Sequence, residues 1–365
     1  MININFMPSR RLAWYMARLF VTRSLAVLAI LVMVLMALDL LGESGKILNV
    51  PGNGEAELWY YVSLRVPMLI ARFMPFAVLL GTLIALSGLN QSSEVVAMKA
   101  AGLSAHQILA PMIIASFGIA AIAFAFNETL VVNATRTATA WADGDYRPLK
   151  VESGILSNVW VRDGSRLIFA RHVGGRGTGV HLEGVTIYDR ESGALVRTTE
   201  AARADQRPGG WRLTDVRVYN TATNVVRNLP TLDSLSGVEP TRFTLAKVSA
   251  ANRDVRSLGT AITDLENAGR PSAEARTGWW HKFSGPLSTV LMPLLAALAA
   301  FGLARSGQVL LRAAIGMALG FTYFVVDNFS VALGNVGAYP PFLAAWAPFL
   351  LFLFIGEAVL IRSEE

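Results

Sequence analysis

Few residues of this chain have the type and spacing that catalysis requires. Cysteine is absent, no G-x-S-x-G nucleophile elbow occurs, and the histidines form no H-E-x-x-H pair. The four histidines are His106, His172, His181 and His281. The segment Gly42-Glu-Ser-Gly45-Lys46 lacks the G-x-x-x-x-G-K-[ST] spacing of a phosphate-binding loop. We therefore expect no catalytic residue, no metal site and no cofactor, and no ATP hydrolysis by the chain alone.

One polar segment, residues 91–102, has the pattern of a short helix between two turns. Serines precede Glu94, whose charge suits the first turn of a helix, and Gly102 can supply a left-handed stop. Val95 and Met98 are three residues apart and therefore share a helix face. The pattern permits either an interfacial turn at a membrane surface or a coupling helix that docks on a cytoplasmic ATPase.

Isolated charges stand near the ends of long apolar stretches. The candidates to face a cavity or a partner are Asp39, Lys46, Arg65, Arg72, Arg136 and Asp327. Charges at membrane depth are costly and usually face a cavity or a partner, and arginine forks suit phosphate groups. The alternative is that the arginines extend to the membrane surface and the aspartates pair with neighbouring side chains.

The elements that must position these residues follow from the composition. Of 365 residues, 53% are hydrophobic and only 16% are charged, against about 25% in ordinary soluble domains. A membrane-spanning helix needs about 20 apolar residues. Six stretches qualify, the first three without any charge: 73–93, 107–127, 283–304, 20–41, 310–333 and 342–361. The chain is therefore predicted to be a polytopic helical membrane protein.

Arginines concentrate on one side of the predicted spans. Four lie before or at the start of the first span, with no acidic residue among them: Arg10, Arg11, Arg18 and Arg23. Three more lie at later span ends on the same side: Arg305, Arg312 and Arg362. Basic residues favour the cytoplasmic side, so we expect both termini in the cytoplasm. The net charge of +6 then reflects topology, not nucleic-acid binding.

The part between the third and fourth spans, residues 128–278, has a different texture and is expected in the periplasm. Short alternating runs flank the turn sequences Asp163-Gly164, Ser192-Gly193 and Pro208-Gly-Gly, which predict β-hairpins. A helical segment is expected at 255–269. The predicted fold is thus three helices (1–127), an all-β domain resembling a jelly roll, sandwich or open barrel (128–278), and three further helices (279–365).

Motifs along almost the whole chain resemble one family. The segment from Glu94 to Ser104 is similar to the S-E-x-x-x-M-x-x-x-G motif of the LptF/LptG permeases of the lipopolysaccharide export ABC transporter. Further matches, in chain order, are Arg65-Val-Pro67, Phe73-Met-Pro75, Gly154 to Gly164, Trp280-x-Lys282, Gly320 to Asp327 and Tyr339-Pro-Pro341. The Trp-x-x-Asp-Gly stretch and the region of Asp327 are closer to the LptG branch.

The resemblance implies a half-transporter of the bacterial inner membrane. It would pair with an LptF-like paralogue, bind a dimer of an LptB-like ATPase that holds the ATP, and pass lipopolysaccharide to LptC-like and LptA-like periplasmic proteins on the way to the outer membrane. Glu94, Val95, Met98 and Gly102 would then couple to the ATPase, and the isolated charges from Asp39 to Asp327 named above would line the substrate cavity or its lateral gate.

Alternate residues of the β domain are expected to face inward. They are Val159, Val161, Leu167, Phe169, Val185 and Ile187. Such a stripe ordinarily forms a core; the resemblance implies that it also lines a passage for acyl chains.

Two other classes of function stay open from the residues. The first is the permease of another periplasm-facing lipid or lipoprotein ABC system, which usually has four spans. The second is a membrane-anchored enzyme or a non-transporting scaffold, which would bind no ATPase.

Overall fold

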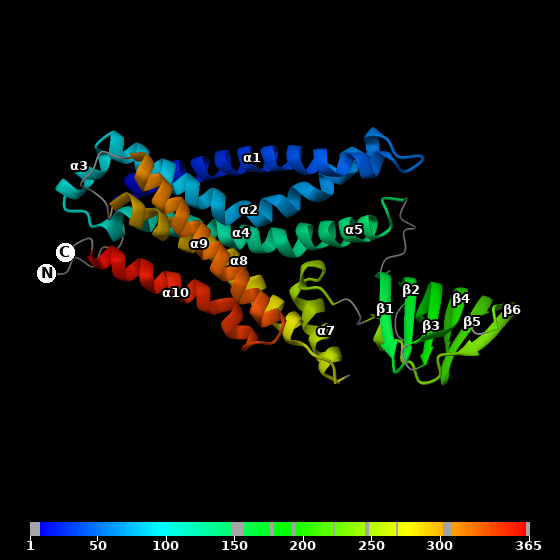
Figure 1. Ribbon diagram of the computed structural model, residues 1–365. Helices are drawn as coiled ribbons and strands as arrows, with labels where there is room; N and C mark the ends of the chain where they lie inside the picture. The colour runs from blue at the N-terminus through cyan, green and yellow to red at the C-terminus, as the bar shows by residue number, and fades with distance from the viewer. Residues whose placement is uncertain are drawn as a thin grey trace.

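The computed structural model describes residues 8–147, 156–175, 179–191, 194–221, 223–244, 248–267, 269–301 and 309–362. A bundle of long helices carries a β-sheet at one end (Figure 1). Arg305, the Ser192-Gly193 turn, the start of the Gly154–Gly164 motif and the end of the 283–304 run lie outside these residues.

Six helices or continuous helix runs in the described part of the chain are long and apolar enough to cross a membrane. This confirms the six spans expected from the sequence. They are α1 (Arg10–Leu48), α2 (Glu55–Gln91), the run α4 (Ala105–Phe126), η1 (Asn127–Val131) and α5 (Val132–Asp143), α8 (Ala273–Phe301), α9 (Val309–Asn335) and α10 (Pro341–Arg362).

Several of these helices extend beyond the apolar runs that identified them. Residues 128–143, which we had assigned to the β domain, continue the third helix, first as the π-helix η1 and then as α5. A 39-residue helix such as α1 is about 58 Å long, whereas the hydrocarbon layer is about 30 Å thick. Hydropathy detects only the part of a helix inside that layer.

The helices pack around α8, and α1 lies at the edge of the bundle. In the most apolar window of each helix, 72% of the residues of α8 are buried but only 11% of those of α1. The two helices α1 and α2 approach closely at Gly81, where a Cβ atom would come within 2.4 Å of the Ser24 hydroxyl. Small residues allow such close packing of membrane helices.

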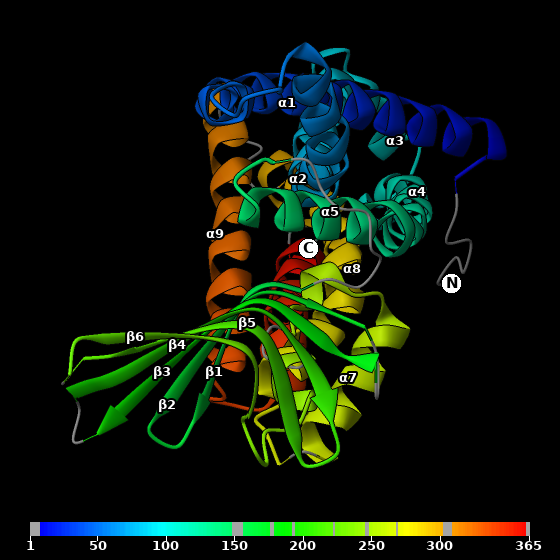
Figure 2. The same ribbon diagram turned by 90° about the vertical axis from the view of Figure 1, so that its right-hand side faces the viewer.

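The β domain is one antiparallel sheet in which the strands follow chain order, β1 to β6. The strands are β1 (Leu156–Asp163), β2 (Arg166–Gly174), β3 (His181–Glu191), β4 (Ala194–Arg207), β5 (Gly210–Asn220) and β6 (Val225–Ser234). This order is a meander, so the described strands do not show the expected jelly-roll topology. Figure 2 shows that the sheet is strongly curved.

The first hairpin corrects our assignment of inward-facing residues. Asp163 pairs with Arg166 around the turn Gly164-Ser165, and Val161 pairs with Ile168. Residues that pair across two strands point to the same side of the sheet. In this hairpin each odd-numbered residue of β1 pairs with an even-numbered residue of β2. Ile168 and Ala170 therefore join Val159, Val161, Val185 and Ile187 in the buried cluster. Leu167 and Phe169 lie on the opposite face, so assigning them inward was wrong.

The buried face of the sheet is covered by the chain that follows β6. Leu235, Val238 and Phe243, the last in the short helix α6 (Thr241–Thr244), are buried against it. The Trp211 indole Nε1 donates a hydrogen bond of 2.8 Å to the Val238 carbonyl oxygen. The stripe therefore forms a closed core in this structure. The chain then returns to α8 through the 3-10 turn η3 (Ala250–Asn252) and helix α7 (Val255–Asn267).

Candidate functional site

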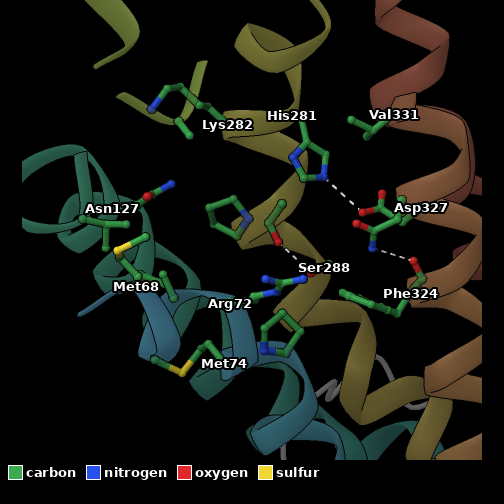
Figure 3. A pocket seen from close by; sticks show the side chains of 18 of the residues that line it. Met68, Arg72, Met74, Asn127, His281, Lys282, Ser288, Phe324, Asp327 and Val331 are labelled. Atoms are coloured by element: carbon green, nitrogen blue, oxygen red, sulfur yellow. Dashed lines mark hydrogen bonds and ion pairs between the residues drawn. The ribbon is translucent and has the colours of Figure 1, made fainter. Parts of the chain in front are cut away.

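A cavity of about 600 Å³ lies between α2, the third helix run, α8 and α9 (Figure 3). Its polar lining residues include Arg65, Arg72, Asn127, His281, Lys282 and Asp327. Its apolar lining includes Met68, Met74, Phe76, Met292 and Phe324. The cavity therefore offers charged groups and a methionine- and phenylalanine-rich surface to the same ligand.

The two arginines predicted for the cavity differ in their surroundings. The Arg65 guanidinium is held by Asp39 on α1, with Nε–Oδ2 and Nη2–Oδ1 distances of 2.8 and 2.9 Å. The Tyr61 hydroxyl donates to the same carboxylate at 2.7 Å. Arg72 also lines the cavity, and the described residues offer its side chain no hydrogen-bond or ion-pair partner. Arg72 is therefore the better placed of the two to bind an anionic ligand.

Helix α8 adds a charge that we had not chosen from the sequence. Lys282 lines the cavity, and its Nζ lies 2.6 Å from Oε1 of Glu128 on η1. The residue precedes the uncharged run 283–304, so hydropathy placed it outside the membrane. Its occurrence in the Trp280-x-Lys282 motif was the available signal.

A second polar pair of α8 joins this helix to α9. His281 Nε2 lies 3.1 Å from Oδ2 of Asp327, which is one of the predicted cavity residues (Figure 3). Asp327 therefore lines the cavity and also pairs with a neighbouring side chain. The two roles that the sequence left open as alternatives for this residue occur together.

Lys46 and Arg136 are not among the described residues that line the cavity. The exposed Lys46 ammonium binds Glu43 at 2.8 Å, and Glu43 accepts a second hydrogen bond of 2.9 Å from the Tyr146 hydroxyl. Burial, together with this bond, raises the pKa of Tyr146 to about 12, so it remains a neutral donor. Arg136 donates instead to the backbone oxygen of Asn252 at 3.2 Å.

The segment predicted as a short helix is α3 (Glu94–Ala100), at the end of the bundle opposite the sheet (Figure 1). Gly102 has a φ of 85° and so ends α3 in the left-handed conformation that the sequence predicts. Glu94 accepts hydrogen bonds from Ser92 at 2.8 Å and from Tyr15 on α1 at 3.4 Å.

The apolar face of α3 is turned inward. Val95 and Met98 are only 4% and 8% exposed and belong to the core of the helical bundle. Our expectation that they provide a contact surface for a partner was wrong, because the bundle itself needs that face. Val96 is 65% exposed and is the largest exposed apolar side chain of α3.

The arrangement fits the binding of a large amphiphile. A cavity with an apolar lining, paired charges and a guanidinium that is unpaired among the described residues can hold an anionic headgroup and acyl chains together. Among the described residues, no group of three or more histidine or acidic side chains could hold a metal ion.

Comparisons with known proteins agree with this chemistry. Residues 14–362 match the model of the family described as lipopolysaccharide export system permease LptF/LptG. The lipopolysaccharide export system permease protein LptG of Escherichia coli K12 is 27% identical over 316 residues, which cover 83% of this chain and 85% of that protein. The LptG protein of Haemophilus influenzae is 26% identical over 329 residues, covering 86% and 89%.

Proposed function

Because the chain belongs to the LptF/LptG family, it is a multi-pass permease of the lipopolysaccharide export system, and we propose that the cavity between α2, α8 and α9 receives lipopolysaccharide during export. Lipopolysaccharide combines a phosphorylated sugar headgroup with several acyl chains. The cavity has matching parts, since Arg72 is unpaired among the described residues and Met68, Met74 and Phe324 supply an apolar wall. The Arg72 guanidinium, which is unpaired among the described residues and lines the same cavity as these apolar side chains, is the observation that carries the proposal.

Photo-crosslinking in the assembled transporter tests it. A photoreactive amino acid in place of Met68 should crosslink to lipopolysaccharide in reconstituted vesicles. Arg72→Gln should lower the yield several-fold, and Arg72→Lys should lower it less, because a lysine keeps the charge but loses the bidentate fork. Arg256→Gln is the matched control, since Arg256 is an exposed arginine of α7 outside the cavity. A yield that is the same in all variants would contradict the proposal.

The partners and orientation belong to the same proposal. We infer that α3 docks on an LptB-like ATPase dimer in the cytoplasm, that both termini lie on that side, and that the chain pairs with an LptF-like paralogue in the bacterial inner membrane. The location of α3 opposite the sheet supports this orientation (Figure 1). The sheet would then face LptC-like and LptA-like proteins in the periplasm and belong to a jelly-roll domain.

Because the sequence has no cysteine, single cysteines can report the orientation. Asn224→Cys between β5 and β6 should react with a membrane-impermeant maleimide added to the periplasmic side of cells. Ala97→Cys on α3 should react only after the membrane is opened. The reverse pattern would overturn the orientation.

The inward stripe of the sheet can serve acyl chains only after a rearrangement. In this structure Val159, Val161, Val185 and Ile187 are buried in one cluster with Val238 and Phe243. We therefore propose that any acyl passage along the stripe requires the segment 235–244 to move away from the sheet.

A further inference from the structure

The linker that joins the sheet to α8 crosses the sheet-facing end of the cavity. We define this linker as residues 248–255. Ser249, Ala250 and Ala251 line the cavity directly. The linker therefore forms part of the cavity wall.

One carboxylate on η1 binds the end of the linker, which Arg136 and Trp279 also contact through the backbone oxygens of Asn252 and Val255. Oε1 of Glu128 accepts from the Lys282 ammonium at 2.6 Å, and Oε2 accepts from the backbone N–H of Val255, also at 2.6 Å. Val255 is the first residue of α7, and its N–H has no acceptor within that helix. A negative charge is favourable there. Glu128 therefore joins the cavity wall to the end of the linker.

Of this pair, Lys282 is the residue that lines the cavity, and Glu128 is not among the described residues that do. Lys282 is only 7% exposed, although it lines the cavity. A buried ammonium requires an anionic partner, because an unpaired buried charge is strongly unfavourable. Glu128 supplies that anion here, and a phosphate group entering the cavity could supply it instead.

The packing of the linker against α8 depends on a glycine. A Cβ atom on Gly278 would lie 2.2 Å from the Cβ atom of Ala250, so any larger residue must push the linker outward. By contrast, a Cβ atom on Gly285, which lines the same cavity from the same helix, would meet its nearest neighbour, His281, at 3.5 Å. Gly285 therefore tolerates a methyl group that Gly278 does not.

We propose that the Lys282–Glu128 pair is a latch that keeps the linker across the cavity until an anionic headgroup takes the place of Glu128 at Lys282. Glu128 then releases the N-terminus of α7, and the linker moves away from α8. Glu128 and Lys282 act as positioning residues for the transfer step. The inference rests on the proposed function, since it needs an anionic ligand in the cavity.

Distance measurements between two spin labels test the latch in the complete transporter. Labels on cysteines at Arg256, exposed on α7 directly after the linker, and Val336, exposed directly after α9, report the position of the linker's end at the start of α7. We expect lipopolysaccharide to produce a second, different distance population, and dephosphorylated lipopolysaccharide to leave the distribution unchanged. Gly278→Ala should produce the second population without any ligand, whereas Gly285→Ala should match the unsubstituted protein.

Photo-crosslinking at Met68 on the same samples separates the two proposals. Crosslinking with no change of distance on adding lipopolysaccharide, or an unchanged distribution in Gly278→Ala, would overturn the latch while the cavity function stands. Absence of crosslinking would instead reject the cavity function itself. The double variant Glu128→Gln/Lys282→Gln removes both charges together and should shift the distance without added ligand; a wild-type distribution in a folded double variant would also reject the latch.

Discussion

Arg65 on α2 and Asp39 on α1 are joined by two parallel hydrogen bonds of 2.8 and 2.9 Å, although α1 is otherwise the least buried of the long helices. Paired bonds between guanidinium and carboxylate are among the stronger side-chain interactions. This pair, together with the Tyr61 hydroxyl that donates to the same carboxylate, holds the C-terminal part of α1 against α2.

Loss of this pair should weaken the attachment of α1. Asp39→Asn and Arg65→Gln should each lower the free energy of unfolding by about 1–3 kcal/mol, and the double variant should cost less than the sum of the two. Lys46→Gln, which removes an exposed pair with Glu43, should cost about 0–1 kcal/mol. Thermal unfolding of the purified complexes measures all four variants. Additive effects of Asp39→Asn and Arg65→Gln would show that the pair contributes nothing.

The two faces of α3 should respond differently to substitution. Val96→Asp alters an exposed side chain and should reduce co-purification of the ATPase with little change in unfolding temperature. Met98→Asp places a charge in the core of the bundle and should lower the yield of folded protein. Glu94→Lys, which changes a partly exposed carboxylate, should resemble Val96→Asp. Full ATPase binding in both Val96→Asp and Glu94→Lys would contradict docking at α3.

The register of β1 and β2 predicts opposite outcomes for neighbouring residues. Ile168→Ala opens a cavity in the buried cluster and should cost about 2–5 kcal/mol, whereas Leu167→Ala on the other face should cost about 1 kcal/mol or less. Limited proteolysis of the sheet at increasing denaturant concentration compares the two. Greater sensitivity of Leu167→Ala would contradict the register.

Acid should weaken the contact between α7 and the start of α8. Hydrogen bonds from Arg276, and then from Ser272, hold the pKa of Glu266 below its ordinary value of 4.5. A lowered pKa in the folded state contributes stability above the ordinary value, and this contribution is lost as pH falls through the folded value. Unfolding temperature should therefore fall less steeply below about pH 4.5 in Glu266→Gln than in the unsubstituted protein. Identical pH profiles would contradict this role of Glu266.

Local features of the chain were predictable because their causes are local. The length of an apolar run determines whether a helix can span a membrane, so the six spans were found. Gly102 tolerates positive φ, and the end of α3 followed from that property. The motif around Glu94, together with the further motifs along the chain, indicated the family that the comparisons show.

The pairing of charges and the direction of side chains depended on the tertiary structure. Glu128 and Lys282 are 154 residues apart, and no local pattern relates them. Val95 and Met98 have the spacing of a shared helix face, but only packing decides whether that face meets the bundle or a partner. Leu167 and Phe169 alternate correctly along their strand, yet the choice between the two faces came from the pairing around Gly164-Ser165. Sequence spacing specifies which residues share a face, whereas burial, and with it the cost of an unpaired charge, depends on what the rest of the chain places opposite.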